Sequence, residues 1–146
     1  MNPLRRKTLL GAAAALLLKP FAALAAWSKD AFGAKTAADA LKSLGVAGAQ
    51  PSKDLVIEAP QIAENGAVVP IEVSSAIAGT TAIAVIIEKN PFPLVGKFDF
   101  SESALPFVKL NVKMGETSEV RVVAEAGGKH YVATREIKVT IGGCGG

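Results

Sequence analysis

The chain has 146 residues, half of them hydrophobic, and a formal net charge of +3 at pH 7. This length is enough for one domain, and no internal repeat or low-complexity region is present. Residues 1–25 contain four basic side chains and no acidic one, so without them the charge of +3 becomes −1, which removes any electrostatic case for binding nucleic acid.

The first 25 residues have the three parts of an export signal. The positive region Arg5-Arg6-Lys7 precedes an apolar run, Leu9–Leu18, which is too short to span a membrane. The small residues of a cleavage site follow in Ala23-Leu24-Ala25. We therefore expect cleavage after Ala25 and a mature protein in the periplasm.

The export route is also indicated by the sequence. Arg5 and Arg6, followed by Leu9 and Leu10, fit a twin-arginine signal, and Lys19-Pro20 near the end of the apolar run agrees with it. The alternative is an ordinary secretory signal that contains two arginines. We expect the twin-arginine route, with residues 26–141 as the folded domain and residues 142–146 as a separate arm.

The mature chain begins with a helical pattern. Small and apolar residues recur at helical spacing from Ala34 to Leu44. Thr36 and Asp39 resemble a capping box, and Gly45 is placed to end the helix. We expect a short helix from Thr36 to Leu44, followed by a linker over residues 45–53.

From Asp54 onward the hydrophobic period changes to two, which is typical of β-strands. The expected strands are Leu55–Ile57, Val68–Ser74, Thr81–Glu88, Lys97–Phe100, Phe107–Val112, Val120–Ala126 and Lys129–Ile141. Turn signals separate them, including Glu64-Asn65-Gly66 and the hairpin turn Gly127-Gly128. About seven short strands with regular turns predict an all-β fold, a β-sandwich.

Three of these strands allow more specific predictions. Pro70 indicates that Val68–Ser74 is an edge strand or contains a bulge. Thr81–Glu88 is rich in Ile and Val, so we expect a central strand that must be covered on both faces, for example by a second subunit. Lys129–Ile141 is the longest strand and continues directly into the C-terminal tail.

Few residues outside the tail could support catalysis or hold a metal. The single histidine, His130, lies in the last hairpin, where a ring in solvent is the simplest interpretation. Met114 is the one methionine left after the signal is removed, which is too few for a copper carrier. A Cys–His pair would require His130 to reach Cys144. We therefore expect no cofactor, no metal site and no active site within this chain.

The chain ends in a pentapeptide that holds its one cysteine, Gly142-Gly143-Cys144-Gly145-Gly146. Glycine has no side chain and the widest backbone freedom, so this composition predicts a mobile tether with a thiol near its tip. An exposed thiol is a liability unless it is used. In an exported protein an odd cysteine pairs with another chain, is capped or carries out chemistry. We interpret Cys144 as a functional thiol, the alternative being an idle chain end.

Several segments of the chain resemble the SoxY family, the covalent sulfur carriers of the periplasmic thiosulfate-oxidising system. They are Ile57–Gly66 with Val69-Pro70-Ile71, the corner Glu88–Pro93, and Val139-Thr140-Ile141 leading into the terminal pentapeptide. The pentapeptide is the most specific of them. The resemblance implies an immunoglobulin-like sandwich with a short N-terminal helix, in which Cys144 carries the sulfur and Gly142, Gly143, Gly145 and Gly146 form its swinging arm.

The resemblance also implies partners, and a carrier rather than an enzyme. They are a second subunit, SoxZ, a haem enzyme that joins thiosulfate to the thiol, a manganese hydrolase that releases sulfate, and a molybdenum enzyme that oxidises the remaining sulfane sulfur. The metals belong to these partners. The competing hypothesis is an exported structural domain whose Cys144 forms an intermolecular disulfide, whereas a thiol oxidoreductase would need a second cysteine.

Overall fold

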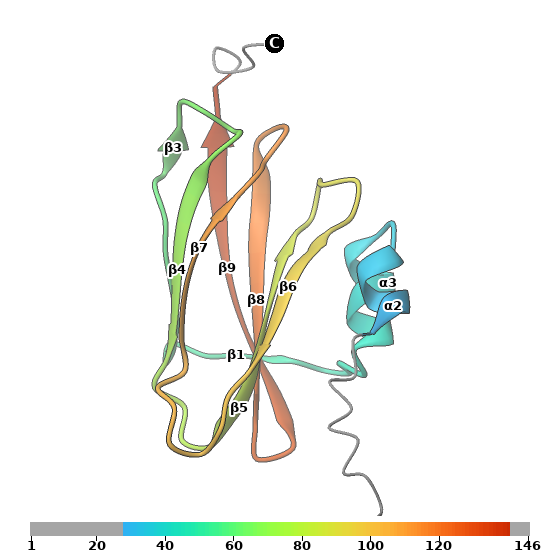
Figure 1. Ribbon diagram of the computed structural model, residues 1–146, viewed down its shortest axis with the longest axis vertical. Helices are drawn as coiled ribbons and strands as arrows, with labels where there is room; N and C mark the ends of the chain where they lie inside the picture. The colour runs from blue at the N-terminus through green and yellow to red at the C-terminus, as the bar shows by residue number, and fades with distance from the viewer. Residues whose placement is uncertain (1–27, 141–146) are drawn as a thin grey trace, which may run out of the picture.

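The computed structural model describes residues 28–140, which form two packed β-sheets with two short helices beside them (Figure 1). The predicted signal and the terminal pentapeptide lie outside the described residues. The helices are α2 (Lys29–Gly33) and α3 (Ala37–Ser43). The strands are β1 (Gln50–Pro51), β2 (Leu55–Glu58), β3 (Ile62–Ala63), β4 (Val69–Ser75), β5 (Thr80–Ile87), β6 (Leu94–Asp99), β7 (Phe107–Val112), β8 (Ser118–Ala126) and β9 (Lys129–Val139).

The two sheets confirm the all-β sandwich expected from the sequence. The larger sheet has the strand order β1-β9-β8-β5-β6, and β3 pairs with β9 outside this path. The smaller sheet has the order β2-β4-β7. All seven predicted strands are present, although β6 begins at Leu94 rather than at Lys97. The structure adds the two-residue strands β1 and β3, because each pairs in parallel with β9, a partner that no local pattern reveals.

The main core lies between the inner faces of the two sheets. Because successive side chains of a strand point to opposite faces, every second residue of a strand lies on the inner face of its sheet. The smaller sheet contributes Leu55, Ile57, Val69, Ile71, Val73, Val108 and Val112. The larger sheet contributes Ile83, Val85, Ile87, Val120, Val122, Ala124 and Ile137. Met114 packs into the same core with 1% of its surface exposed, so its thioether is a packing group.

Strand β5 is central, as predicted, and it lies between β8 and β6. Its second face is covered by the chain itself: a smaller core joins β5 and β6 to the two helices. This core consists of Ala31, Ala40, Ala84, Ile86 and Leu94. The expected cover on both faces is therefore present, and on this face α2 and α3 of the same chain supply it, as Figure 1 shows at the outer side of the larger sheet.

The ends of α3 agree with the prediction. The Thr36 hydroxyl accepts a hydrogen bond from the Asp39 N–H at 3.1 Å and donates one to the Asp39 carboxylate at 2.7 Å. Gly45 follows the last turn with a φ of +72°, a conformation that favours glycine. Helix α2 lies within the stretch from Trp27 to Leu44 that can be helical, but it was not expected as a separate helix, because its single turn is too short to show a hydrophobic period.

The turn predictions are also confirmed. Gly127 and Gly128 have φ values of +56° and +72°, which is the pattern of the two-residue hairpin turn that matches strand twist. At the β3–β4 connection the Asn65 side chain accepts a hydrogen bond from the Ala67 N–H at 2.9 Å. The Gly127-Gly128 turn fixes which residues of β8 and β9 face each other, beginning with Ala126 and Lys129.

The prediction for Pro70 is wrong. Strand β4 is the middle strand of the smaller sheet, and its register with β7 runs without a shift from Val69 to Ser74. The proline is tolerated because β2 pairs with β4 only from Glu72 to Ser75. At Pro70, therefore, the ladder has β7 on one side and no residue of β2 on the other, which relaxes the demand for an N–H donor.

Replacement of Ile86 by alanine should destabilise the domain through the helix-covered face. Ile86 is fully buried, so we expect Ile86→Ala to lower the free energy of unfolding by about 2–5 kcal/mol. The matched control is Ile62→Ala, which removes the same atoms from a side chain that is 55% exposed and should cost less than about 1 kcal/mol. Urea denaturation followed by circular dichroism measures both, and equal losses would contradict the assignment of the second core.

Candidate functional site at the end of β9

Strand β9 ends at one pole of the sandwich, at the top of Figure 1. Thr140 is the last described residue, and Cys144 follows it by four positions. The predicted carrier residues Gly142, Gly143, Cys144, Gly145 and Gly146 lie outside the described residues, so their roles stay predictions. What the structure describes is the platform that precedes them.

The end of β9 extends beyond the start of its hairpin partner. Ser118, the first residue of β8, pairs with Ile137, and the ladder between the two strands stops there. Two N–H groups of the protruding end donate to the segment that contains β3: Lys138 to the Gln61 carbonyl at 3.0 Å, and Thr140 to the Ala63 carbonyl at 3.1 Å. The N–H group between them, that of Val139, donates to the Thr117 hydroxyl oxygen at 2.9 Å.

Gly66 holds the β3–β4 connection against this strand end. Its carbonyl accepts a hydrogen bond from the Met114 N–H at 2.7 Å. A Cβ at Gly66 would lie 2.2 Å from the Met114 carbonyl oxygen and 2.8 Å from Cγ1 of Val139, so only glycine permits this approach. The sequence marked Gly66 as a turn residue, and only the structure shows that it packs against β9.

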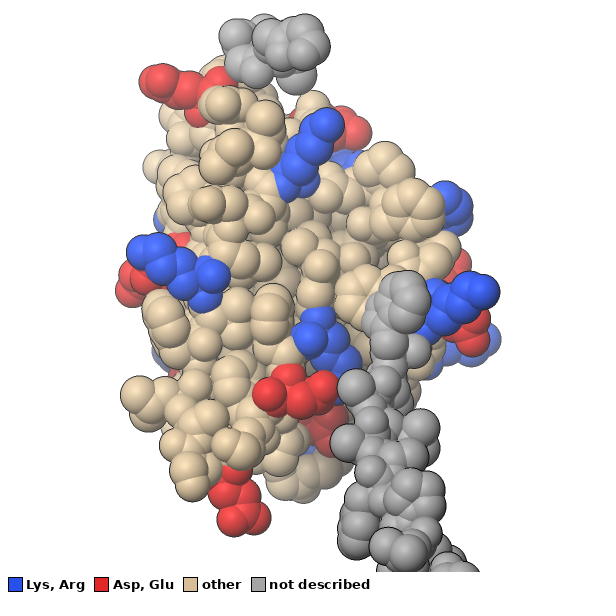
Figure 2. All heavy atoms as spheres, in the orientation of Figure 1, with Lys and Arg blue, Asp and Glu red and all other residues tan. Residues whose placement is uncertain are grey.

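The surface at this pole is mixed in character. Ile62 and Val68 are each 55% exposed, and Lys89 lies 3.6 Å from Glu116 in an exposed ion pair. On the face shown in Figure 2, basic and acidic side chains are scattered among uncharged ones and do not gather into one patch. The described part of this pole thus presents apolar side chains and paired charges together.

The structure excludes a pair between His130 and Cys144 of the same chain. His130 lies near the start of β9, and ten residues of extended strand, about 33 Å, separate it from Thr140. Four extended residues span at most about 14 Å. His130 is partly buried beside its register partner Glu125, and is thus less exposed than predicted.

Within residues 28–140, no three His, Cys, Asp or Glu side chains lie close enough together to hold a metal ion. Neither α2 nor α3 is long and apolar enough to cross a membrane.

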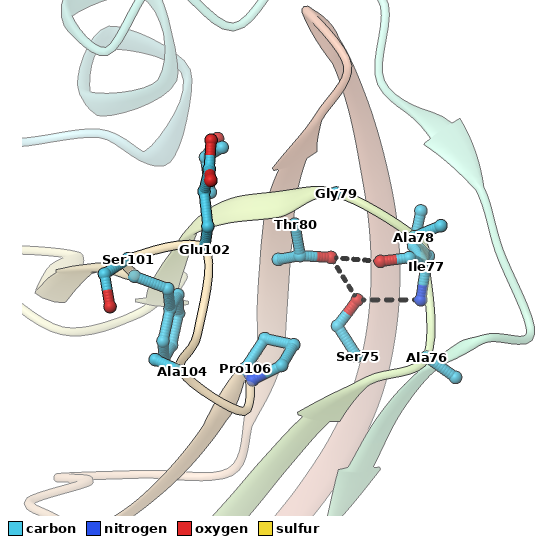
Figure 3. Close-up of a pocket in the computed structure, with 12 residues that line it drawn as sticks. Ser75, Ala76, Ile77, Ala78, Gly79, Thr80, Ser101, Glu102, Ala104 and Pro106 are labelled. Carbon is cyan, nitrogen blue, oxygen red and sulfur yellow. Dashed lines mark hydrogen bonds between the residues drawn. The ribbon is translucent and has the colours of Figure 1, made fainter.

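A cavity of about 530 Å³ lies between the β4–β5 and β6–β7 connections (Figure 3). Thr80 at its rim pairs with Ala126, next to the β8–β9 turn, so the cavity is at the pole opposite Thr140. Two hydroxyl groups of its lining bond one another: the Ser75 and Thr80 oxygens are 2.8 Å apart, and Thr80 donates to the Ile77 carbonyl at 2.7 Å. These hydrogen bonds shape the β4–β5 connection, and both hydroxyl groups already have partners within the chain.

The sequence pattern described as "Sulfur oxidation protein SoxY" matches residues 41–144, well over half of the chain. The chain belongs to the SoxY family. Among solved structures, the sulfur carrier protein SoxY from Chlorobium limicola f thiosulfatophilum is 42% identical, with a TM-score of 0.64 over 69% of this chain and 92% of that one. A superoxide reductase (neelaredoxin) from Ignicoccus hospitalis is 21% identical, with a TM-score of 0.53 over 59% of this chain and 79% of that one, which shows a shared fold alone. Comparison with curated proteins gave no significant match.

In this SoxY-family protein the matched region contains every strand of the described chain and reaches Cys144. The family resemblance seen in the sequence is therefore confirmed. The sequence did not indicate a role for Thr117. Its hydroxyl oxygen accepts a hydrogen bond from the Val139 N–H, which is 22 residues away, and no local pattern links the two residues.

Replacement of Gly66 should disturb the end of β9. Gly66→Ala brings a Cβ against the Met114 backbone and the Val139 side chain, and we expect a loss of about 1–3 kcal/mol in the free energy of unfolding. The matched control is Gly115→Ala, in the neighbouring connection, where a Cβ would meet nothing within 4 Å. Denaturant unfolding of both variants measures the difference, and a Gly66→Ala protein as stable as Gly115→Ala would refute this packing.

Proposed function

We propose that this protein is a sulfur carrier that holds thiosulfate-derived intermediates covalently on Cys144 and presents them to separate Sox enzymes. The observation that carries the proposal is the family match, which extends through Cys144. It is supported by the name of the 42% identical relative, a sulfur carrier protein. In this proposal the described domain is a platform, and the catalytic groups belong to the partners.

The chemistry proposed for Cys144 is that which the resemblance to the SoxY family implies. In the first step the thiol loses its proton, its sulfur bonds to the outer sulfur of thiosulfate, and two electrons leave to the haem of the conjugating enzyme. In the second, water cleaves the bond to the sulfonate group at the manganese hydrolase, which releases sulfate and leaves a persulfide on the carrier. The remaining sulfane sulfur is then either oxidised by a molybdenum enzyme or passed to storage. The thiolate is the reacting form of cysteine, and we infer that the partner sites promote its formation.

A tethered intermediate has a physical advantage in such a sequence of reactions. While the carrier is docked, the bound sulfur stays at high local concentration near the enzyme and is not lost by diffusion. From Thr140 the backbone of Cys144 could reach about 14 Å when fully extended. Glycine on both sides of Cys144 removes every neighbouring Cβ that could collide with the walls of a narrow channel.

We further propose a second subunit of the SoxZ type. Because the helices cover β5, this proposal rests on the family and not on an uncovered central strand. The outer face of the smaller sheet is a candidate contact: Val56, Ser74 and Phe107 lie in one row, and Val56 and Phe107 are 41% and 49% exposed. In the next row Lys109 pairs with Glu72, whose hydrogen bond and charge raise the pKa of this exposed lysine.

Export to the periplasm by the twin-arginine route completes the proposal. Its support is the pattern of residues 1–25, with Arg5-Arg6 ahead of the apolar run. We expect the protein recovered from the periplasm to begin at Ala26, within a residue or two, which N-terminal sequencing measures. Replacement of both arginines by lysine should leave the full-length chain in the cytoplasm, and normal export of that variant would contradict the twin-arginine route.

Replacement of Cys144 by serine tests the carrier function. The mass of the intact wild-type protein should increase by one thiosulfate unit after incubation with thiosulfate and the haem enzyme, and Cys144→Ser should show no increase, because the chain has no other thiol. Circular dichroism should show the same fold for both, since residue 144 lies beyond the last strand. A serine variant that still loads would refute the proposal, and a wild-type protein found only as a disulfide dimer would favour the structural alternative.

A further inference from the structure

The last three described residues of the chain, which are the final two of β9 and Thr140, are held by groups that do not belong to the paired β8–β9 hairpin. Their N–H groups point alternately to the two edges of the strand. Lys138 donates to the Gln61 carbonyl, Val139 to the Thr117 hydroxyl oxygen and Thr140 to the Ala63 carbonyl. A strand end that outruns its partner frays unless it is tied down. Here hydrogen bonds to other parts of the chain hold both edges of the protruding end.

Thr117 replaces a backbone carbonyl that β8 does not supply. Strand β8 begins at Ser118, so the side chain of the preceding residue extends the ladder to Val139. Thr117 is partly buried, and its branched Cβ restricts rotation of the hydroxyl group about χ1. The acceptor is therefore held in place for one backbone N–H group.

The opposite edge is held by a segment that is itself anchored. Strand β3 pairs in parallel with Lys138 and Val139, and Gly66 just after it bonds to Met114 and packs on Val139. The carbonyls of Gln61 and Ala63 are thus fixed relative to the core. Two independent parts of the chain converge on the same three residues.

We propose that Thr117 is a positioning residue for the carrier thiol: with the Gln61 and Ala63 carbonyls it fixes Thr140 as the origin of the arm and so sets the reach of Cys144. This inference rests on the proposed function of Cys144. The partners that it fits are enzymes whose reacting atom lies in a recess within reach of a four-residue arm.

The length of the arm shows why the hydrogen bonds of residues 138–140 matter. From a fixed Thr140 the chain to Cys144 spans at most about 14 Å, whereas release of residues 138–140 extends this to about 25 Å. The effective concentration of a tethered group falls roughly as the −3/2 power of tether length, so an increase from four to seven residues lowers it about twofold. Release also removes the fixed direction in which the arm leaves the domain.

Hydrogen exchange of the full mature protein tests directly whether the Thr117 hydroxyl holds the end of β9. Thr117→Val keeps the shape of the side chain but removes the acceptor, and the amides of Val139 and Thr140 should exchange about tenfold faster than in the wild type. Thr117→Ser retains the hydroxyl and is the matched control, with exchange close to that of the wild type. The amide of Val120, in the middle of the sheet, should be unchanged in both. Unchanged exchange at Val139 in Thr117→Val would overturn the proposal.

The loading reaction tests the positioning role. With the haem enzyme and thiosulfate, kcat for loading of Cys144 should fall about twofold in Thr117→Val with KM unchanged, because docking is intact and only the effective concentration of the thiol falls. Alkylation of Cys144 by iodoacetamide should proceed at the same rate in all variants, since it needs no docking. A second variant, Thr140→Pro, removes the donor to Ala63 on the other edge and should change kcat in the same direction.

The outcomes separate the two proposals. If the wild-type protein loads at Cys144 and kcat is unchanged in both Thr117→Val and Thr140→Pro, the positioning role alone is overturned. A wild-type protein that does not load at Cys144 would refute the carrier function, and the positioning role with it.

Discussion

The structure depends on the pairing of β9 along both of its edges. One edge pairs with β8 from Lys129 to Ile137. The other edge is covered by a single stretch of chain that meets β9 at β1, leaves for the smaller sheet as β2, and returns as β3. Between these two contacts, Arg135 of β9 donates to the Ile57 carbonyl of β2 at 3.3 Å and links the sheets. The strand that precedes Cys144 is therefore held along both of its edges.

This arrangement separates rigidity from chemistry. The two cores fix the sheets and helices, and the described residues contain no metal-ligand cluster. The cavity between the β4–β5 and β6–β7 connections lies at the pole far from Thr140, and His130 is too distant to assist the thiol. The function proposed for Cys144 needs a stable platform, and the described end of β9 meets this requirement.

The helices change how the surface of this SoxY-family protein is understood. From the sequence, the apolar alternation on both faces of β5 suggested an interface with another subunit. Ala84 and Ile86 instead pack on Ala31 and Ala40 within the same chain. Exposed apolar residues are found elsewhere, in the row that contains Val56 and Phe107 on the smaller sheet and at Ile62 and Val68 beside the end of β9.

The sequence by itself determined the features that depend on neighbouring residues. Hydrophobic alternation located the seven longer strands, Thr36 and Gly45 defined the ends of α3, and Gly127-Gly128 specified the hairpin turn. It also singled out Cys144 as the candidate carrier. The tertiary structure alone decided the placement of β1 and β3, the central position of β4 despite Pro70, and the contacts of Gly66 and Thr117 with Val139. The physical reason is that each of these depends on partners distant in the chain, and a local pattern carries no information about which distant segment will supply the missing hydrogen bond or fill the adjacent space.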